Sequence, residues 1–190
     1  MRIISLLPSA TEIVCALGLA GNLVGRSHEC DYPAEIPTLP ALTAPRFNPE
    51  GASAEVDRRV KSIVQNALSV YRVDADQLIA LRPDAIVTQS QCEVCAVSER
   101  DLEEALGQWM GAGRPAIVSL TATSLDGVYA DIARAAAVLG AEPAGVQVVA
   151  AMKRRINAIA TRAAAAASMV AQGVRHPELM TRIFAPACRL

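Results

Sequence analysis

The opening stretch of the chain constrains its fold most strongly, because an apolar run there meets a helical pattern at a proline. Residues 3–7 are almost continuously apolar, which is typical of a strand covered on both faces and paired in parallel. After Pro8, apolar residues recur at helical spacing up to Gly18, and Ser9 followed by Glu12 is a capping-box pattern. The stretch therefore predicts a strand, a tight turn and a helix.

The turn in this unit is a candidate binding element. It comprises Pro8, Ser9, Ala10 and Thr11, and it follows the carboxyl end of the predicted strand. In open α/β sheets ligands bind at that edge, and free backbone N–H groups at a helix start favour anionic or polar ligand groups. An ordinary capped helix start, without ligand contact, is the alternative interpretation.

Later segments repeat the same alternation of strand and helix. Apolar runs predict strands at residues 23–27, 85–88 and 116–120, and helices are predicted to start at Ser53, Asp74, Ser98 and Ser124. The proline-rich stretch 33–49 predicts an extended connection with at most one short strand. This order requires a mostly parallel sheet of about four strands with right-handed crossovers and no hairpin among them.

Beyond residue 142 the pattern changes to one long helix. An apolar stripe runs from Val146 to Val170, and Gly173 is the predicted stop. We therefore expect an α/β lobe over residues 1–142, a long helix over 143–172 and an irregular tail over 173–190. The stripe lacks a predicted partner in its second half, so a homodimer through this helix is expected.

Composition narrows the classes of partner. The 190 residues are 52% hydrophobic, and 18 basic side chains nearly balance 19 acidic ones, which favours a folded domain and excludes nucleic acid and anionic membranes as default partners. Pro8 and Glu12 interrupt the only candidate export signal, so the sequence predicts a cytoplasmic chain whose five cysteines are reduced.

A cluster of potential metal ligands follows two of the predicted strands. His28, Glu29 and Cys30 come after one strand, and Cys92 and Cys95 after another, with the residue types of a zinc site. The same cysteine pair is compatible with thiol redox chemistry, and His28 with Glu29 could instead form a hydrogen-bonded lip of the loop. No Ser-His-Asp order, Walker loop or dinucleotide fingerprint occurs, so an enzyme is not predicted.

Four segments carry a resemblance to a known family. Residues 5–12 contain the turn, and residues 25–33 contain His28, Glu29 and Cys30. The other two segments are residues 81–87, which run into a predicted strand, and residues 91–97, which contain Cys92 and Cys95. In this order they resemble the cobalamin-binding and iron-complex-binding proteins of ABC importers. The resemblance implies two Rossmann-like lobes bridged by one long helix, with a corrinoid, haem or siderophore held between them.

The resemblance also implies a partner, a location and a set of binding residues. An ABC permease and a periplasmic location would follow for an exported protein, no cofactor would be required, and His28 would be placed to ligate corrinoid cobalt. The candidate ligand-binding residues are Pro8, Ser9, Ala10, Thr11, Arg26, His28, Glu29, Tyr32, Gln89 and Gln91, with Cys30, Cys92 and Cys95 as candidate metal ligands.

One departure from the family is visible in the sequence. No second series of strands and helices follows the long helix, so a second lobe is not predicted and the chain is expected to be truncated or frame-shifted. A single lobe encloses too little of a ligand for tight binding. The alternatives are a cytoplasmic protein that handles thiols or metals through Cys30, Cys92 and Cys95, and a remnant that binds nothing.

Overall fold

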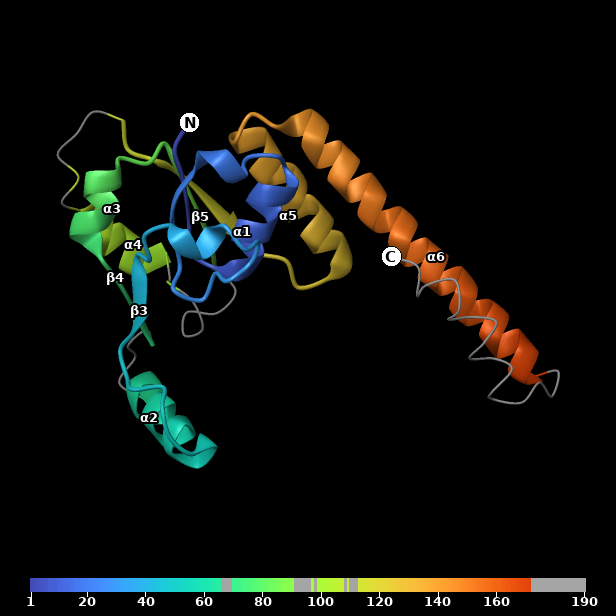
Figure 1. The fold of residues 1–190 in the computed structure, drawn as a ribbon, viewed down its shortest axis with the longest axis horizontal. Helices are drawn as coiled ribbons and strands as arrows, with labels where there is room; N and C mark the ends of the chain where they lie inside the picture. Colours follow the sequence, from blue (N-terminus) through green and yellow to red (C-terminus); the bar gives the residue numbers. More distant parts are fainter. Residues whose placement is uncertain (66–69, 91–96, 98, 108, 110–112, 172–190) are drawn as a thin grey trace. The chain divides into compact units, whose positions relative to one another are not determined.

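The protein folds into an α/β lobe followed by one long helix (Figure 1). A computed structural model describes residues 1–65, 70–90, 97, 99–107, 109 and 113–171. The chain divides into two compact units, residues 1–148 and residues 149–190. The first unit contains the sheet and the candidate site.

A four-stranded parallel sheet forms the centre of the lobe, in the order β2-β1-β5-β6. The strands are β1 (Ile3–Ser5), β2 (Leu23–Arg26), β5 (Ala85–Gln89) and β6 (Ala116–Leu120). Each pair is parallel, as the continuous apolar runs predict, because strands buried on both faces are joined by crossovers rather than hairpins. The predicted single parallel sheet is confirmed.

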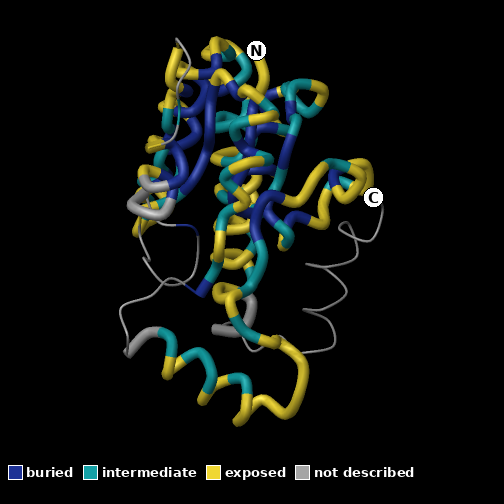
Figure 2. Tube along the Cα trace, turned by 90° about the vertical axis from the view of Figure 1, so that its left-hand side faces the viewer, coloured by how far each residue is buried: buried dark blue, intermediate teal, exposed yellow. Residues whose placement is uncertain are grey.

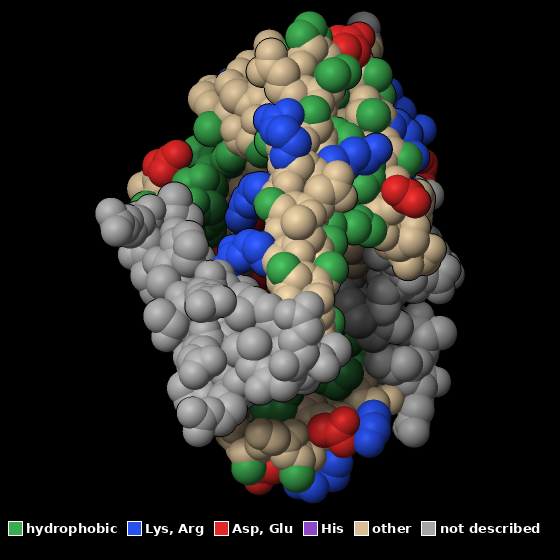
Figure 3. Space-filling model, turned by 90° about the vertical axis from the view of Figure 1, so that its right-hand side faces the viewer, with side chains coloured by type: hydrophobic (Ala, Val, Ile, Leu, Met, Phe, Trp, Pro, Cys, Tyr) green, Lys and Arg blue, Asp and Glu red, His purple; other side chains and the backbone are tan. Residues whose placement is uncertain are grey.

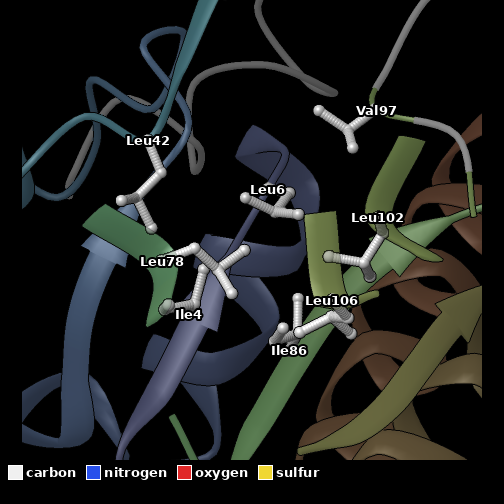
Figure 4. Packing of buried hydrophobic residues seen from close by; sticks show 8 residues of the cluster. All are labelled: Ile4, Leu6, Leu42, Leu78, Ile86, Val97, Leu102 and Leu106. Atoms are coloured by element: carbon white, nitrogen blue, oxygen red, sulfur yellow. The ribbon is translucent and has the colours of Figure 1, made fainter. Parts of the chain in front are cut away.

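Helices cover both faces of this sheet (Figure 1). Their bounds are α1 (Pro8–Ala16), α3 (Ala75–Leu81), α4 (Glu99–Leu106) and α5 (Leu125–Val138), and the long helix α6 (Glu142–Ala171) follows them in the chain. Ile4 and Ile86 are in register and point to the face that α3 and α4 cover. They belong to a buried cluster of Ile4, Leu6, Leu42, Leu78, Ile86, Val97, Leu102 and Leu106 (Figure 4).

Of the five predicted helix caps, two form, two do not, and the one at Ser98 lies outside the described residues. The Asp74 side chain accepts from the Gln77 N–H, and the Ser124 side chain accepts from the Gly127 N–H. The capping box at Ser9 is wrong, because α1 already begins at Pro8, which has no N–H to satisfy and fits the first helical position. The cap at Ser53 is also one residue late, since the Val56 N–H donates to the Ala52 carbonyl.

A short antiparallel ribbon lies beside β2. The sequence predicts at most one of its two strands, the one within residues 33–49. The ribbon pairs β3 (Thr43–Pro45) with β4 (Tyr71–Val73), and an isolated parallel bridge joins Arg26 to Ala41. The helix α2 (Ser53–Gln65) connects the two strands. No described side chain of α2 is fully buried, which Figure 2 shows as teal and yellow along this helix. The described apolar side chains of this helix, Val56, Val60 and Ile63, are therefore only partly buried.

The first turns of α6 leave exposed the residue at which the predicted stripe begins. Gly145 is the buried residue of its first turns, whereas Val146 is 71% exposed. The reason is that the helix backbone approaches α5 where a side chain would not fit. Among the described residues no helix combines the length and the apolarity that crossing a membrane requires.

The part of α6 in the second unit carries small, apolar and basic side chains on its surface. Figure 3 shows apolar side chains along the helix with Lys and Arg beside them. Ile159, in the predicted stripe, is 62% exposed. The helix, predicted over residues 143–172, is observed over residues 142–171.

Candidate ligand-binding site

The carboxyl ends of the four parallel strands meet at one edge of the sheet, and the candidate residues follow three of these strands. The turn into α1 follows β1, the loop from Ser27 to Tyr32 follows β2, and Gln89 is the last residue of β5. This arrangement is the one that places ligands in open α/β folds.

At the start of α1 the four predicted residues divide into accessible and buried ones. Ser9 is exposed and Pro8 half-buried, whereas Ala10 and Thr11 have no exposed surface. The Thr11 hydroxyl lies 2.8 Å from Ser5 Oγ and 3.0 Å from Cys30 Sγ. Thr11 therefore ties the β2 loop to the start of α1, and Pro8 and Ser9 are the side chains that a ligand can reach.

Arg26 holds the chain that follows the site rather than projecting freely from it. Its Nε donates to the Leu39 carbonyl at 3.2 Å, Nη1 to the Ser27 carbonyl at 2.9 Å and Nη2 to the Pro37 carbonyl at 3.0 Å. Three carbonyls in one guanidinium fork fix the proline-rich connection against the end of β2. We therefore assign Arg26 a supporting role at this edge.

His28 is half-buried and is held by the antiparallel ribbon. Its Nδ1 lies 2.7 Å from Thr43 Oγ1, and its backbone N–H donates to the same oxygen at 3.0 Å. The His28 ring meets the Tyr71 ring edge-on, with the ring centroids 5.0 Å apart. The pKa of His28 is lowered, mainly because the ring is partly buried. The nearby charge of Arg26 lowers it further, and the carboxylate of Glu29 opposes the shift.

The next residues of the loop are the most accessible part of the candidate site. Glu29 is exposed, and its Oε1 accepts a hydrogen bond of 2.7 Å from the Tyr71 hydroxyl. Tyr32 is 64% exposed and precedes a cis peptide bond to Pro33. Gln89, at the end of β5, is half-buried, and Gln91 lies outside the described residues. Glu29 and Tyr32 thus offer a carboxylate and an aromatic ring to a ligand at this edge.

Cys30 has the environment of a structural thiol. It is 1% exposed, and burial raises the pKa of its thiol, opposed by hydrogen bonds from Thr11 and the Ser27 backbone. A metal ligand must be a thiolate, which burial disfavours. The other two predicted ligands, Cys92 and Cys95, lie outside the described residues. Within the part of the chain that the structure describes, no three His, Cys, Asp or Glu side chains are grouped to hold a metal ion.

Sequence reasoning missed Thr43 and Tyr71, which shape the surroundings of His28. Both lie on the β3–β4 ribbon, far from His28 in sequence, and Thr43 is 5% exposed. A pocket of about 430 Å³ lies over the same ribbon, lined by residues 41–44 and 72–74. The two strands of the ribbon have three residues each. Such short strands cannot be recognised in the sequence from an alternation of apolar and polar residues.

The family of the chain follows from a match over almost its whole length. The model of the family described as periplasmic binding protein matches residues 3–184. The chain belongs to the periplasmic binding protein family. This is a family of solute-binding proteins that are typically periplasmic. No curated protein matches the chain.

Solved structures share the fold of this periplasmic binding protein at low sequence identity. A periplasmic heme-binding protein from Pseudomonas aeruginosa is 20% identical with a TM-score of 0.63, over 88% of this chain and 48% of that one. The periplasmic vitamin B12-binding protein of Vibrio cholerae is 22% identical with a TM-score of 0.57, over 85% and 51%. A possible iron-binding protein from Staphylococcus epidermidis is 22% identical with a TM-score of 0.57, over 82% of this chain and 48% of that one.

These comparisons confirm the resemblance that the sequence motifs indicated. They also set its extent, because the chain spans about half the length of the solved structures it matches. At these identities the solved structures show the fold alone. The nature of the ligand has to be argued from the site of this chain.

Proposed function

We propose that this chain is the ligand-binding lobe of a substrate-binding protein that serves an ABC importer for a corrinoid, or for a related metal chelate. The family supports the solute-binding role, and the folds of vitamin B12-binding and heme-binding proteins support the ligand class. An ABC permease is the proposed protein partner, and the periplasm the proposed location.

One observation carries the proposal. The carboxyl edge of the parallel sheet gathers accessible groups of different chemistry from separate loops: the Ser9 hydroxyl, the His28 imidazole, the Glu29 carboxylate and the Tyr32 ring. A metal chelate with a flat ring and a polar rim requires this combination, because aromatic rings contact its faces while polar groups contact its edge. Buried Cys30 does not support the alternative of a thiol-handling or metal-handling protein.

The affinity expected for these residues alone is modest. Ligand pockets commonly enclose about 70–90% of a ligand's surface, and one lobe covers about half of it. We expect dissociation constants above about 1 μM, equivalent to less than about 8 kcal/mol of binding free energy.

The test is titration calorimetry with cyanocobalamin and, separately, with hemin. Ser9→Trp places a large ring at the proposed edge and should abolish the binding heat. Ala137→Trp, at an exposed position in the last turn of α5, is the matched control and should bind as the unmodified chain does. Absence of binding to both ligands at millimolar concentration, or equal effects of the two tryptophans, would contradict the proposal.

A further inference from the structure

We propose that the Ser27–Thr43 hydroxyl pair holds His28 as the tautomer that carries its proton on Nε2, so that His28 binds the ligand by donating to an oxygen and not by ligating its metal. Thr43 is then a positioning residue for His28. The ligand half of this inference rests on the proposed function, whereas the tautomer is a property of the free chain.

The geometry places three donors or acceptors around one hydroxyl oxygen. Thr43 Oγ1 accepts from the His28 backbone N–H at 3.0 Å, and it lies 3.0 Å from Ser27 Oγ and 2.7 Å from His28 Nδ1. Ser27 Oγ also accepts from the Glu29 N–H at 3.4 Å. Ser27 and Thr43 are 3% and 5% exposed, so water has little access to either hydroxyl.

Only one arrangement of protons satisfies every group in this cluster. If Ser27 donates to Thr43 and Thr43 donates to Nδ1, both hydroxyl protons have acceptors, and the neutral ring carries its proton on Nε2. In the reverse arrangement Nδ1 donates to Thr43, and Thr43 donates to Ser27. The Ser27 proton then has no acceptor among the described residues, a costly state for a buried hydroxyl.

The antiparallel ribbon fixes the ring in this orientation. Thr43 is opposite Val73, and Pro45 is opposite Tyr71, so Thr43 and Tyr71 project from the same face of the ribbon. Thr43 binds the His28 ring at Nδ1, while the Tyr71 ring packs against it edge-on. Within the described part of the chain Nε2 has no hydrogen-bond partner, so Nε2 is the atom left for a ligand.

The position of the proton decides what His28 can bind. A metal ion needs the lone pair of an unprotonated ring nitrogen, and metal-bound histidines usually donate their other N–H to a carbonyl or carboxylate. Here Nδ1 accepts instead, and Nε2 offers a proton. The chemical class that it recognises is an oxygen acceptor, such as a carboxamide or carboxylate on the rim of a metal chelate.

The tautomer is measured directly in the free chain by long-range ¹H–¹⁵N correlation spectra of the histidine rings at neutral pH. The His28 signals are identified by their loss in His28→Gln. We expect a protonated Nε2 and an unprotonated Nδ1, a mixture of tautomers in Thr43→Val, and the original state in Thr43→Ser. A protonated Nδ1 in the unmodified chain would overturn the inference whether or not any ligand binds.

The ligand arm compares cyanocobalamin with aquocobalamin, whose axial water can be exchanged. If His28 donates to a rim oxygen, the two bind with equal affinity, and the visible spectrum of aquocobalamin stays unchanged. His28→Phe should then weaken both about 5- to 10-fold, and His28→Gln, which keeps a donor, less. A spectral change on binding that His28→Gln abolishes would show metal ligation and overturn the inference. No binding of either corrinoid would instead contradict the proposed function and leave the tautomer result standing.

Discussion

Gly145 of α6 lies so close to Ala136 of α5 that a Cβ atom at position 145 would come within 2.5 Å of the Ala136 Cβ. Real side chains do not tolerate such a contact, so the glycine sets the distance between these two helices. This relationship explains why Gly145 is the buried residue in the first turns of α6 and Val146, which begins the predicted stripe, is exposed.

Gly145→Ala should therefore destabilise the lobe, although alanine has the higher helix propensity. Overpacking of this kind costs about 1–3 kcal/mol, which urea denaturation followed by circular dichroism can measure. Gly21→Ala is the matched control, because no atom lies within 4 Å of its added Cβ. An unchanged or raised stability of Gly145→Ala would show that the two helices can separate without cost.

Asp131 should be the most sensitive acidic residue of α5. It is 3% exposed, and its Oδ2 accepts the backbone N–H groups of Thr121 and Ala122 at 2.8 and 2.9 Å. Asp131→Ala leaves both donors without this acceptor, and we expect a loss of roughly 3 kcal/mol in the free energy of unfolding. Asp126→Ala, at an exposed position in the first turn, should cost less than about 1 kcal/mol.

How much of this structure the sequence could predict depends on the range of the interactions involved. The four parallel strands were predictable because each is a local apolar run, and the caps at Asp74 and Ser124 because each bonds within its own first turn. Trp109 packs against the core from beyond the end of helix α4 at Leu106, a contact that no local pattern in the sequence indicates.

The supporting residues of the candidate site could not be predicted in the same way. Thr43 contacts His28 across 15 positions, and Tyr71 contacts Glu29 across 42. These contacts exist only after the ribbon has folded against β2. Arg26 was predicted as a ligand-binding residue from the family resemblance, and nothing in the sequence indicated that three backbone carbonyls would surround it.

Cys30 should be protected from thiol reagents in the folded chain, whereas half-exposed Cys15 should react. Burial raises the pKa of both thiols, but only Cys30 is nearly inaccessible, at 1% exposure. Iodoacetamide labelling of the native chain, followed by peptide mass spectrometry, should find Cys30 modified at least about 10-fold more slowly than Cys15. After denaturation the two thiols should react at similar rates. Equal labelling rates in the native chain would contradict a structural role for this thiol.

Acidification should lower the stability of the chain through His28. Because burial lowers the pKa of His28 in the folded state, the unfolded chain binds the proton more readily. The contribution of the neutral ring is fully present above the ordinary histidine pKa of about 6.5, and it is lost as the pH falls through the lower folded value.

The measurement is urea denaturation at pH 7.5, 6.5 and 5.5, a range above the titration of most carboxylates. The unmodified chain should lose more stability over this range than His28→Gln, which lacks the titratable ring at position 28. Parallel pH profiles for the two chains would show that His28 is not held in its neutral form.

The exposed face of α6 should support self-association, as the unpartnered stripe predicts. Ile159 is 62% exposed in a segment otherwise dominated by alanine, and exposed apolar strips commonly mark interaction surfaces. The simplest assembly is a two-fold pair of antiparallel helices.

Ile159→Glu should shift the sedimentation of a concentrated sample towards the monomer. Thr161→Glu, exposed about 200° further round the helix, should not. A dimer with an association free energy of about 5.5 kcal/mol would be half-formed at about 100 μM. If the unmodified chain is strictly monomeric at that concentration, this interface is ruled out.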